Sequence, residues 1–427
     1  MQTPNPYHTQ NERKAQRQLF LNRVYVALGL VFIFFAILFA RMAHLQWVGY
    51  DQYHALAEGN RISVEAIPPV RGKIYDRNHR LLAGNRPIFT LKFDKTKIDD
   101  IAPLAQTLTE LLDNFDAKKR QRFVERFQAA SPHRPIYLTY TLNESEAAKF
   151  AVNNFRFPGV ALVSKLQRYY PHGSAAVHAL GYVGRINQQE LNQLNPSRYA
   201  GTDSLGKLGI EKQYESILHG HPGVQQVETN ANGRVIRKLE TTPPVPGKDI
   251  QLTLDIRLQK HIESILQGHN AAAIVSNPNT GEILAYVSTP VYDPNLFVDG
   301  ISSNQYQALL NDPNRPLINR VVNGQYPPGS TVKPFVALGA IEQSIISPDK
   351  QIFDPGYMEF KGHRYRDWKR EGHGLVDMHD AVVQSCDTYF YELSLDMGIN
   401  MIHDQLYPFG FGHTTGIDLP QESIGIL

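Results

Sequence analysis

The chain is poor in cysteine, because Cys386 is the only one among 427 residues. A single thiol excludes an internal disulfide framework, so packing must stabilise the fold. Neither sign of charge is in large excess, because 43 basic residues stand against 41 acidic ones and leave a formal net charge of +2. Such a balance gives no extended positive field, and we therefore expect no binding to nucleic acid.

Long apolar runs are absent except for one near the N-terminus. The run VYVALGLVFIFFAILFA carries no charge and lies between Arg23 and Arg41. At 1.5 Å per residue it reaches about 25 Å, which is the short end for a membrane-spanning helix. We predict a transmembrane anchor at residues 24–41. A cleaved signal peptide and a buried core helix are the alternatives, but the run is long for a signal peptide and no small-residue cleavage site follows.

The tail before this run is basic. Arg13, Lys14, Arg17 and Arg23 stand against Glu12. Basic flanks stay in the cytoplasm, so residues 1–23 are predicted to form a cytoplasmic tail and the rest of the chain to be exported.

The length favours two or three domains beyond this anchor. Strand and helix patterns interleave without repeats over residues 42–248, which favours an irregular α+β module, and a second unit begins at residue 249. In the first unit we predict helices over 42–61, 98–126 and 144–152 and a strand over 89–93. In the second we predict a strand over 250–254, a helix over 256–266, a hairpin of 271–276 with 282–288, and helices over 380–397.

The pair Ser330-x-x-Lys333 is the strongest sign of chemistry. Residues three apart share one face of a helix, so Lys333 is expected to contact Ser330 and to activate its hydroxyl. Pro334 is tolerated only in a first helical turn, which predicts a helix start close to Ser330. A helix N-terminus also favours developing negative charge.

The four-residue pattern alone is weak. Ser204 with Lys207 and Ser347 with Lys350 repeat it, the first in what reads as a glycine-rich turn and the second in a Pro-Asp loop. A helix-capping serine is the structural alternative for Ser330. Its helical context favours Ser330 over the other two.

An exported, anchored chain with a helical Ser-x-x-Lys after a hairpin resembles the class B penicillin-binding proteins, most closely the elongation-type member called penicillin-binding protein 2. The resemblance implies an α+β multidomain protein: an elongated, non-catalytic pedestal or dimerisation module at 42–248, then the N-terminal part of a serine-transpeptidase α/β domain at 249–427. Runs that match family motifs, besides the one around Ser330, are 71–78, 206–220, 279–285 and 292–295.

The family's second motif, Ser-x-Asn, corresponds to Ser385-Cys386-Asp387. The resemblance implies that Ser385 relays a proton and that the residue at 387 orients Lys333 and the substrate amide. Asp387 departs from the commoner asparagine. A carboxylate beside Lys333 favours the ammonium form, whereas a general base must be neutral.

The family's third motif, Lys-Thr-Gly or Lys-Ser-Gly, does not occur in the 427 residues. In the family it binds the substrate's terminal carboxylate and helps to form the oxyanion hole. We therefore expect a C-terminally truncated transpeptidase domain with little activity by itself.

For a complete molecule the resemblance implies acyl transfer. Ser330 attacks the bond between the two terminal D-alanines of a peptidoglycan stem peptide, and an amine of a neighbouring stem resolves the acyl-enzyme. β-Lactams trap the same serine. The implied partners are a membrane glycan polymerase and the elongation machinery, and the implied location is a bacterial inner membrane, single-pass, with most of the chain in the periplasm.

A structural zinc site is a further expectation. Asp354, Asp367, His373 and Cys386 offer two oxygens, a nitrogen and a sulfur, which suit tetrahedral zinc, and they match zinc positions in some elongation-type relatives. The alternative is that Cys386 is a small buried hydrophobe. His363 and His379 are expected to face solvent.

Three other functions stay open. The chain could be a scaffold that activates a membrane glycan polymerase, a division-type transpeptidase, or a serine β-lactamase or β-lactam sensor. A large module ahead of the serine domain argues against the hydrolase.

Overall fold

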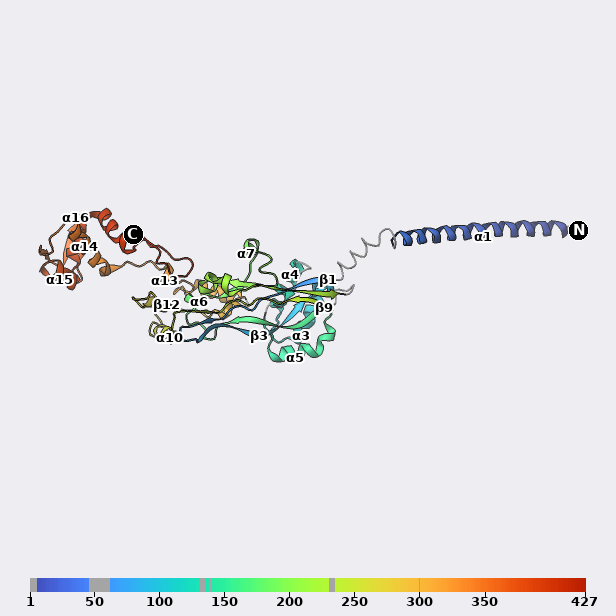
Figure 1. Ribbon diagram of the computed structural model, residues 1–427, viewed down its shortest axis with the longest axis horizontal. Helices are drawn as coiled ribbons and strands as arrows, with labels where there is room; N and C mark the ends of the chain where they lie inside the picture. The colour runs from blue at the N-terminus through green and yellow to red at the C-terminus, as the bar shows by residue number, and fades with distance from the viewer. Residues whose placement is uncertain (1–5, 46–61, 131–135, 139, 230–234, 299) are drawn as a thin grey trace. The chain divides into compact units, whose positions relative to one another are not determined.

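The computed structural model describes residues 6–45, 62–130, 136–138, 140–229, 235–298 and 300–427 (Figure 1). The chain forms two compact units: residues 1–67 with 223–243, and residues 68–222 with 244–427. The predicted helix at 42–61 falls largely outside the described residues.

The first unit holds the apolar helix and a small sheet. Helix α1 (Pro6–Ala43) contains a stretch, Arg17–Ala43, that is long and apolar enough to cross a membrane. Strands β1 (Ile62–Ile67), β8 (Gly223–Thr229) and β9 (Val235–Thr242) form an antiparallel sheet in the order β1-β8-β9.

The second unit is organised around β3 (Leu81–Phe93) and β5 (Val160–Tyr169), which pair antiparallel from Gly84 with Tyr169 to Phe93 with Val160. The strand predicted at 89–93 is thus the end of a longer one. The strand predicted at 250–254 is shorter, because pairing covers only Ile250 and Gln251. The remaining strands of this sheet are β2 (Ile74–Tyr75), β4 (Ile136–Tyr137) and β10 (Ile250–Gln251).

Three capped helices flank this sheet: α3 (Ile101–Leu111), α4 (Ala117–Ala129) and α5 (Glu144–Asn153). The side chains of Asp100, Asp116 and Asn143 each accept a backbone N–H at the helix start. The run predicted as one helical segment over 98–126 is therefore two helices, because Asp116 caps a new start. The short helix predicted at 144–152 is present.

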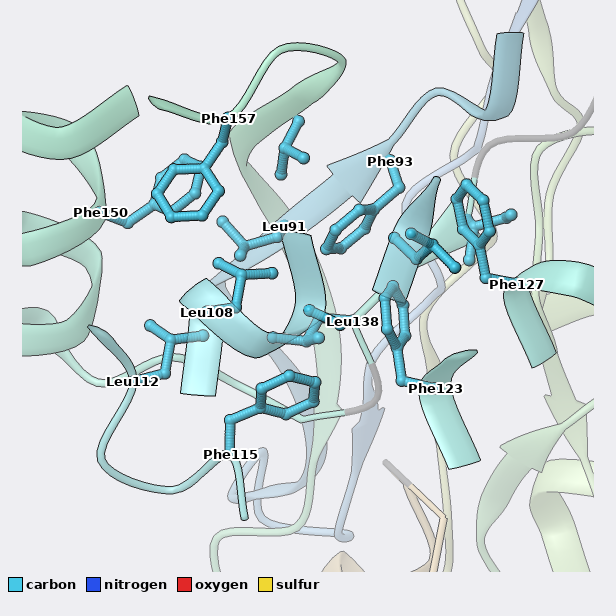
Figure 2. Close-up of a cluster of buried hydrophobic side chains, with 14 of the residues drawn as sticks. Leu91, Phe93, Leu108, Leu112, Phe115, Phe123, Phe127, Leu138, Phe150 and Phe157 are labelled. Atoms are coloured by element: carbon cyan, nitrogen blue, oxygen red, sulfur yellow. The ribbon is translucent and has the colours of Figure 1, made fainter. Parts of the chain in front are cut away.

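The helices and the sheet enclose an aromatic core, shown in Figure 2. Phe93 and Phe123 have ring centroids 4.6 Å apart, and Phe150 and Phe157 are 5.2 Å apart. All four rings are buried, so this module has its own hydrophobic core. Its other labelled members are Leu91, Leu108, Leu112, Phe115, Phe127 and Leu138.

A buried ion cluster joins two of the family motifs. Glu211 accepts hydrogen bonds from Arg168 Nε at 2.6 Å, from Arg71 Nε at 2.8 Å and from the Tyr170 hydroxyl at 3.1 Å. Burial raises the pKa of Glu211, but Arg168 and Arg71 outweigh burial and hold that pKa below its ordinary value. The cluster is charge-paired and structural.

The part of the second unit after residue 252 begins with α10 (Ile256–Ile265) and the predicted hairpin, β11 (Ala271–Ser276) with β12 (Ile283–Thr289). Ser204 lies in strand β7 (Ser204–Gly206), paired with β6 (Val183–Arg185), and not in the turn predicted for it. The other short elements are η2 (Lys95–Lys97), η3 (Asn154–Arg156), α6 (Val177–Leu180), α7 (Gln188–Gln193), α8 (Gly209–Gln213), α9 (Glu215–Leu218), α11 (Asn295–Val298), α12 (Ser303–Asn311) and α13 (Arg320–Asn323).

Residues 329–409 carry the candidate site. Helix α14 (Lys333–Glu342) packs on α16 (Asp387–Leu406), and four short strands and α15 (Met378–Val383) lie between them in sequence. Helical structure was predicted over 380–397 and is present, interrupted at 384–386. The strands are β13 (Ile352–Asp354), β14 (Tyr357–Phe360), β15 (His363–Arg366) and β16 (Gly374–Val376), and η5 (Tyr407–Phe409) follows α16.

Candidate active site

Ser330 lies just before a helix, as its context predicts. It is exposed in the 3₁₀ turn η4 (Gly329–Val332), and α14 begins at Lys333 with Pro334 in its first turn. Proline fits there because the first helical N–H groups have no partner inside the helix. The serine hydroxyl is therefore accessible to a substrate.

Lys333 is buried and makes three polar contacts with the segment around Ser385. Its ammonium donates to Asp387 Oδ1 at 2.7 Å, to the Ser385 carbonyl oxygen at 2.8 Å and to Ser385 Oγ at 3.2 Å. These contacts hold the lysine between α14 and the start of α16.

The two serines are joined directly. Ser385 Oγ donates to Ser330 Oγ at 2.8 Å. Within the described residues no hydrogen bond links Lys333 to Ser330, so the expected direct contact is replaced by a relay through Ser385. The reason is that Asp387 and the Ser385 carbonyl draw the long lysine side chain towards α16.

The backbone at Ser385 is unusual. Its φ is 55°, in the left-handed region that a residue with a Cβ rarely adopts. Non-glycine residues held there cluster at functional sites. The residue that links Ser330 to Lys333 is thus one whose conformation the surrounding structure imposes.

Asp387 is the first residue of α16 and is held by a second carboxylate. Asp367 Oδ2 accepts the backbone N–H of Asp387 at 2.6 Å and that of Thr388 at 3.2 Å. Negative groups are favoured at a helix N-terminus. Asp367 therefore positions the residue that holds Lys333. The sequence predicted Asp367 only as a metal ligand, because a contact made 20 residues away leaves no local pattern.

The four predicted metal ligands converge, and their donor atoms all lie within 4.8 Å of one another. His373 Nδ1 lies 2.8 Å from Asp354 Oδ2 and 3.6 Å from Asp367 Oδ1. Cys386 Sγ lies 3.5 Å from Asp354 Oδ2. His363 and His379 are exposed, as predicted.

These residues fit a zinc ion. Zinc bonds of about 2.0 to 2.3 Å in tetrahedral geometry place the donors about 3.3 to 3.8 Å apart, which is close to the observed spacing. Burial, together with the nearby carboxylates of Asp354 and Asp367, raises the pKa of the Cys386 thiol to about 12. A bound cation would supply the positive charge that a thiolate there requires.

Two family models match the chain. Residues 66–252 match the penicillin-binding protein dimerisation domain, and residues 271–427 match the penicillin-binding protein transpeptidase domain. The domain boundaries predicted from the sequence remain predictions.

Curated relatives match over nearly the whole chain. The peptidoglycan D,D-transpeptidase MrdA of Escherichia coli K12 is 45% identical over 96% of this chain and 66% of its own length. MrdA of Acinetobacter baumannii is 42% identical over 96% of this chain and 61% of its length. MrdA of Salmonella typhimurium LT2 is 42% identical over 97% of this chain and 67% of its length. The chain thus spans about two thirds of the length of these relatives.

Solved structures of PBP2 are also similar to this chain. PBP2 in the complex with MreC from Helicobacter pylori has a TM-score of 0.77 and 33% identity, covering 86% of this chain and 69% of that one. Pseudomonas aeruginosa PBP2 in complex with WCK 5153 has a TM-score of 0.59 and 37% identity, covering 84% of this chain and 60% of that one.

Proposed function

This chain belongs to the penicillin-binding proteins, and from that membership we propose that it acts as a peptidoglycan D,D-transpeptidase of the elongation type. The observation that carries the proposal is the continuous path of polar contacts from Ser330 through Ser385 to Lys333 and Asp387. It unites segments more than 50 residues apart in a chain whose 45% identical relative is a D,D-transpeptidase. A serine that only caps a helix would not need these contacts to Lys333 and Asp387.

The geometry supports acylation of Ser330. As its Oγ attacks the carbonyl carbon between the two terminal D-alanines, its proton passes to Ser385 Oγ, and the Ser385 proton passes to a neutral Lys333 amine. The C–N bond then breaks, and the leaving D-alanine nitrogen takes a proton back along the same path. The amine of a neighbouring stem peptide afterwards attacks the ester carbonyl, forms the cross-link and releases Ser330.

Asp387 holds Lys333 in place in this scheme. Its carboxylate lies 2.7 Å from Lys333 Nζ and fixes that nitrogen next to Ser385. The lysine must lose a proton before it can accept one from Ser385. We assign Asp387 to orientation of Lys333.

Treatment with a labelled penicillin tests this function. Peptide mapping by mass spectrometry is expected to find the acyl adduct on Ser330 in a protein extended by a segment that carries the Lys-Thr-Gly motif, and little adduct on these 427 residues by themselves. The variant Ser330→Ala should lose the adduct, while the matched control Ser347→Ala, in a second Ser-x-x-Lys sequence, should keep it. An adduct on another residue of the extended protein would overturn the assignment.

We also propose that α1 anchors the chain in the bacterial inner membrane, with the N-terminus in the cytoplasm and the remainder in the periplasm. The apolar stretch Arg17–Ala43 and the basic residues of the tail support this. Proposed partners are a membrane glycan polymerase and the elongation machinery, and the H. pylori PBP2 complex with MreC supports the latter. A reporter enzyme that is active only in the periplasm should be inactive when it is fused to the N-terminus. Reporter activity would contradict the proposed orientation.

Zinc bound by Asp354, Asp367, His373 and Cys386 is a separate proposal. With four protein ligands no position is open for water, so the ion would be structural and would stabilise the fold around the start of α16. Metal analysis should find one zinc per chain. Cys386→Ser should lose it, and the exposed control His363→Ala should keep it. No zinc in the unsubstituted protein would end the proposal.

A further inference from the structure

A small cavity lies between the paired strands β3 and β5 and the β6–β7 hairpin. These elements belong to the module that matches the penicillin-binding protein dimerisation domain. The volume of the cavity is about 50 Å³. One water needs roughly 10 to 15 Å³ on the same measure, so the cavity has room for several waters or for one small ion.

The pairing of β3 with β5 decides which side chains line the cavity. Ile88 of β3 lies directly opposite Lys165 of β5. Thr90 is two residues beyond Ile88, and successive side chains of a strand alternate between the two faces, so these three side chains share one face of the sheet. All three line the cavity. Leu91 faces the other way, into the aromatic core, so the cavity is separate from that core.

Two buried polar atoms of the lining have no hydrogen-bond partner among the described residues. They are Thr90 Oγ1 and Arg168 Nη2, and the two residues are only 1% and 5% exposed. Arg168 uses its other nitrogens on Glu211 and on the Gly72 carbonyl oxygen, at 2.6 and 2.7 Å. A buried donor without an acceptor is costly, so a bound group that accepts from both atoms is favoured there.

The charged side chains of the lining are mostly basic. Lys165, Arg168 and Arg185 line the cavity, and Asp203 is the one acidic residue beside them. Lys165 Nζ lies 3.0 Å from Asp203 Oδ2, so this carboxylate is already engaged. The charge of Arg168 is matched by Glu211. The lining therefore carries no acidic group that is free to repel an anion.

Arg126 of α4 adds a positive charge next to the cavity. Its guanidinium forms no ion pair among the described residues and donates to the Tyr137 carbonyl oxygen. Burial and the positive charge of Arg185 lower the pKa of Arg126 to about 10, while the charge of Asp203 opposes this shift. Two guanidinium groups thus lie within electrostatic reach of each other, and an anion near them would offset their repulsion.

We propose that this cavity binds a small free oxyanion of the phosphate or sulfate type. Its oxygens accept from Arg168 Nη2 and Thr90 Oγ1, and the surrounding basic side chains balance its charge. The bound ion joins the β3–β5 sheet to the β6–β7 hairpin and so stabilises this module. The volume suits a free ion better than a phosphate carried on a lipid or a sugar. The inference is independent of the chemistry at Ser330.

Thermal unfolding and equilibrium dialysis of this chain test the proposal, with inorganic phosphate as the probe. We expect saturable binding of one phosphate per chain. The melting temperature should be about 2 to 4 °C higher in phosphate than in sodium chloride of equal ionic strength. Glycerol 3-phosphate carries the same group on a larger body and should bind at least about tenfold more weakly.

A matched pair of substitutions isolates the cavity. Lys165→Gln removes a basic group from the lining and leaves Asp203 without its partner, so the affinity for phosphate should fall at least about tenfold. Lys149→Gln breaks an ion pair of the same kind, with Asp113 at 2.9 Å, elsewhere in the module and should keep the affinity. Because exposed ion pairs contribute little to stability, both variants should melt as the unsubstituted protein does when phosphate is absent.

Thr90→Val is a second variant, which keeps the shape of the side chain. Without phosphate its melting temperature should be unchanged or higher, because an unpaired buried hydroxyl is removed. Its affinity for phosphate should fall about three- to tenfold, because one hydrogen bond to the anion is lost.

Three results would overturn the inference. The first is equal melting in phosphate and in chloride with no saturable binding, which means that the cavity holds only water. The second is an unchanged affinity for phosphate in both Lys165→Gln and Thr90→Val. The third is binding of glycerol 3-phosphate as tight as that of phosphate, which assigns the site to a larger ester. None of these results bears on the acylation of Ser330, so the proposed function is tested separately.

Discussion

The core around Phe123 and the cluster around Cys386 are both buried, but they are built from opposite chemistry. Phe123 is surrounded by other phenylalanines and by leucines, and none of these contacts depends on protonation. Cys386 packs among apolar side chains of α14–α16, but its thiol also faces Asp354, Asp367 and His373, which are polar or charged. Apolar burial stabilises without directional partners, whereas each buried polar group must keep its hydrogen bond or ion.

Substitutions in the two regions are therefore expected to affect stability and acylation differently. The aromatic core belongs to the module matched by the dimerisation family, and the polar cluster lies directly under Ser385 and Asp387. Substitutions in the first region should change the free energy of unfolding with little effect on acylation. Substitutions in the second should slow acylation, and where they remove a buried ligand they should lower the free energy of unfolding as well.

The largest expected effect is on the rate of acylation. Lys333→Met keeps the apolar length of the side chain but removes the amine, so acylation by penicillin should slow by about 10²- to 10⁴-fold. Stopped-flow or time-resolved labelling measures this rate, and thermal unfolding should show a stable fold. A rate within threefold of the unsubstituted protein would show that Lys333 is not the base.

The second prediction concerns the contribution of the aromatic core to stability. Phe123→Ala removes a fully buried ring and should lower the free energy of unfolding by about 3 to 5 kcal/mol. Denaturant titration measures the loss, and the control Phe155→Ala, whose side chain is 84% exposed, should change it by less than about 0.5 kcal/mol. Equal effects of the two variants would contradict the assigned core.

His178 tests whether a polar group in aromatic surroundings makes stability pH-dependent. It lies edge-on to Tyr292, with ring centroids 5.5 Å apart, and its Nε2 lies 3.3 Å from the Pro290 carbonyl oxygen. Burial lowers the pKa of His178 to about 4 from an ordinary 6.5. Between these two values the unfolded chain binds the extra proton, so stability falls as pH drops from 6.5 to 4.

The expected loss from His178 over that window is roughly 2 to 3 kcal/mol. Denaturant titrations at several pH values measure it. The variant His178→Gln cannot titrate, so its stability curve should be flatter by that amount. Identical pH dependence in the two proteins would show that His178 does not titrate as a buried group.

The smallest effect is expected at Asp387. Asp387→Asn keeps an oxygen that can accept from Lys333 and removes only the negative charge, so the acylation rate, measured by time-resolved labelling, should change by less than about tenfold. Asp387→Ala removes the acceptor as well and should be slower than Asp387→Asn. If both variants lose the same activity, the charge rather than the orientation of Lys333 is what matters.

Patterns local in sequence predicted much of the fold. The apolar run before Arg41, the hairpin around residues 277–281 and the helix start near Ser330 are each encoded within a few residues, and all three are present. The break within 98–126 was missed because Asp116 caps a second helix inside one periodic run. The strand at Ser204 was missed because its pairing with Val183–Arg185 is not local.

The sequence by itself determined which residues could react. These are Ser330 with Lys333 at helical spacing, and Ser385 with Asp387 two residues later. The sequence also supplied four ligand-type side chains, three before Ser385 and Cys386 directly after it. Only the tertiary structure decided how they connect. Lys333 turns to Asp387 and Ser385 rather than to Ser330, and Asp367 holds the first turn of α16. The physical reason is that spacing fixes which side chains share a helix face, whereas hydrogen bonds between segments 20 to 55 residues apart depend on how α14 and α16 pack.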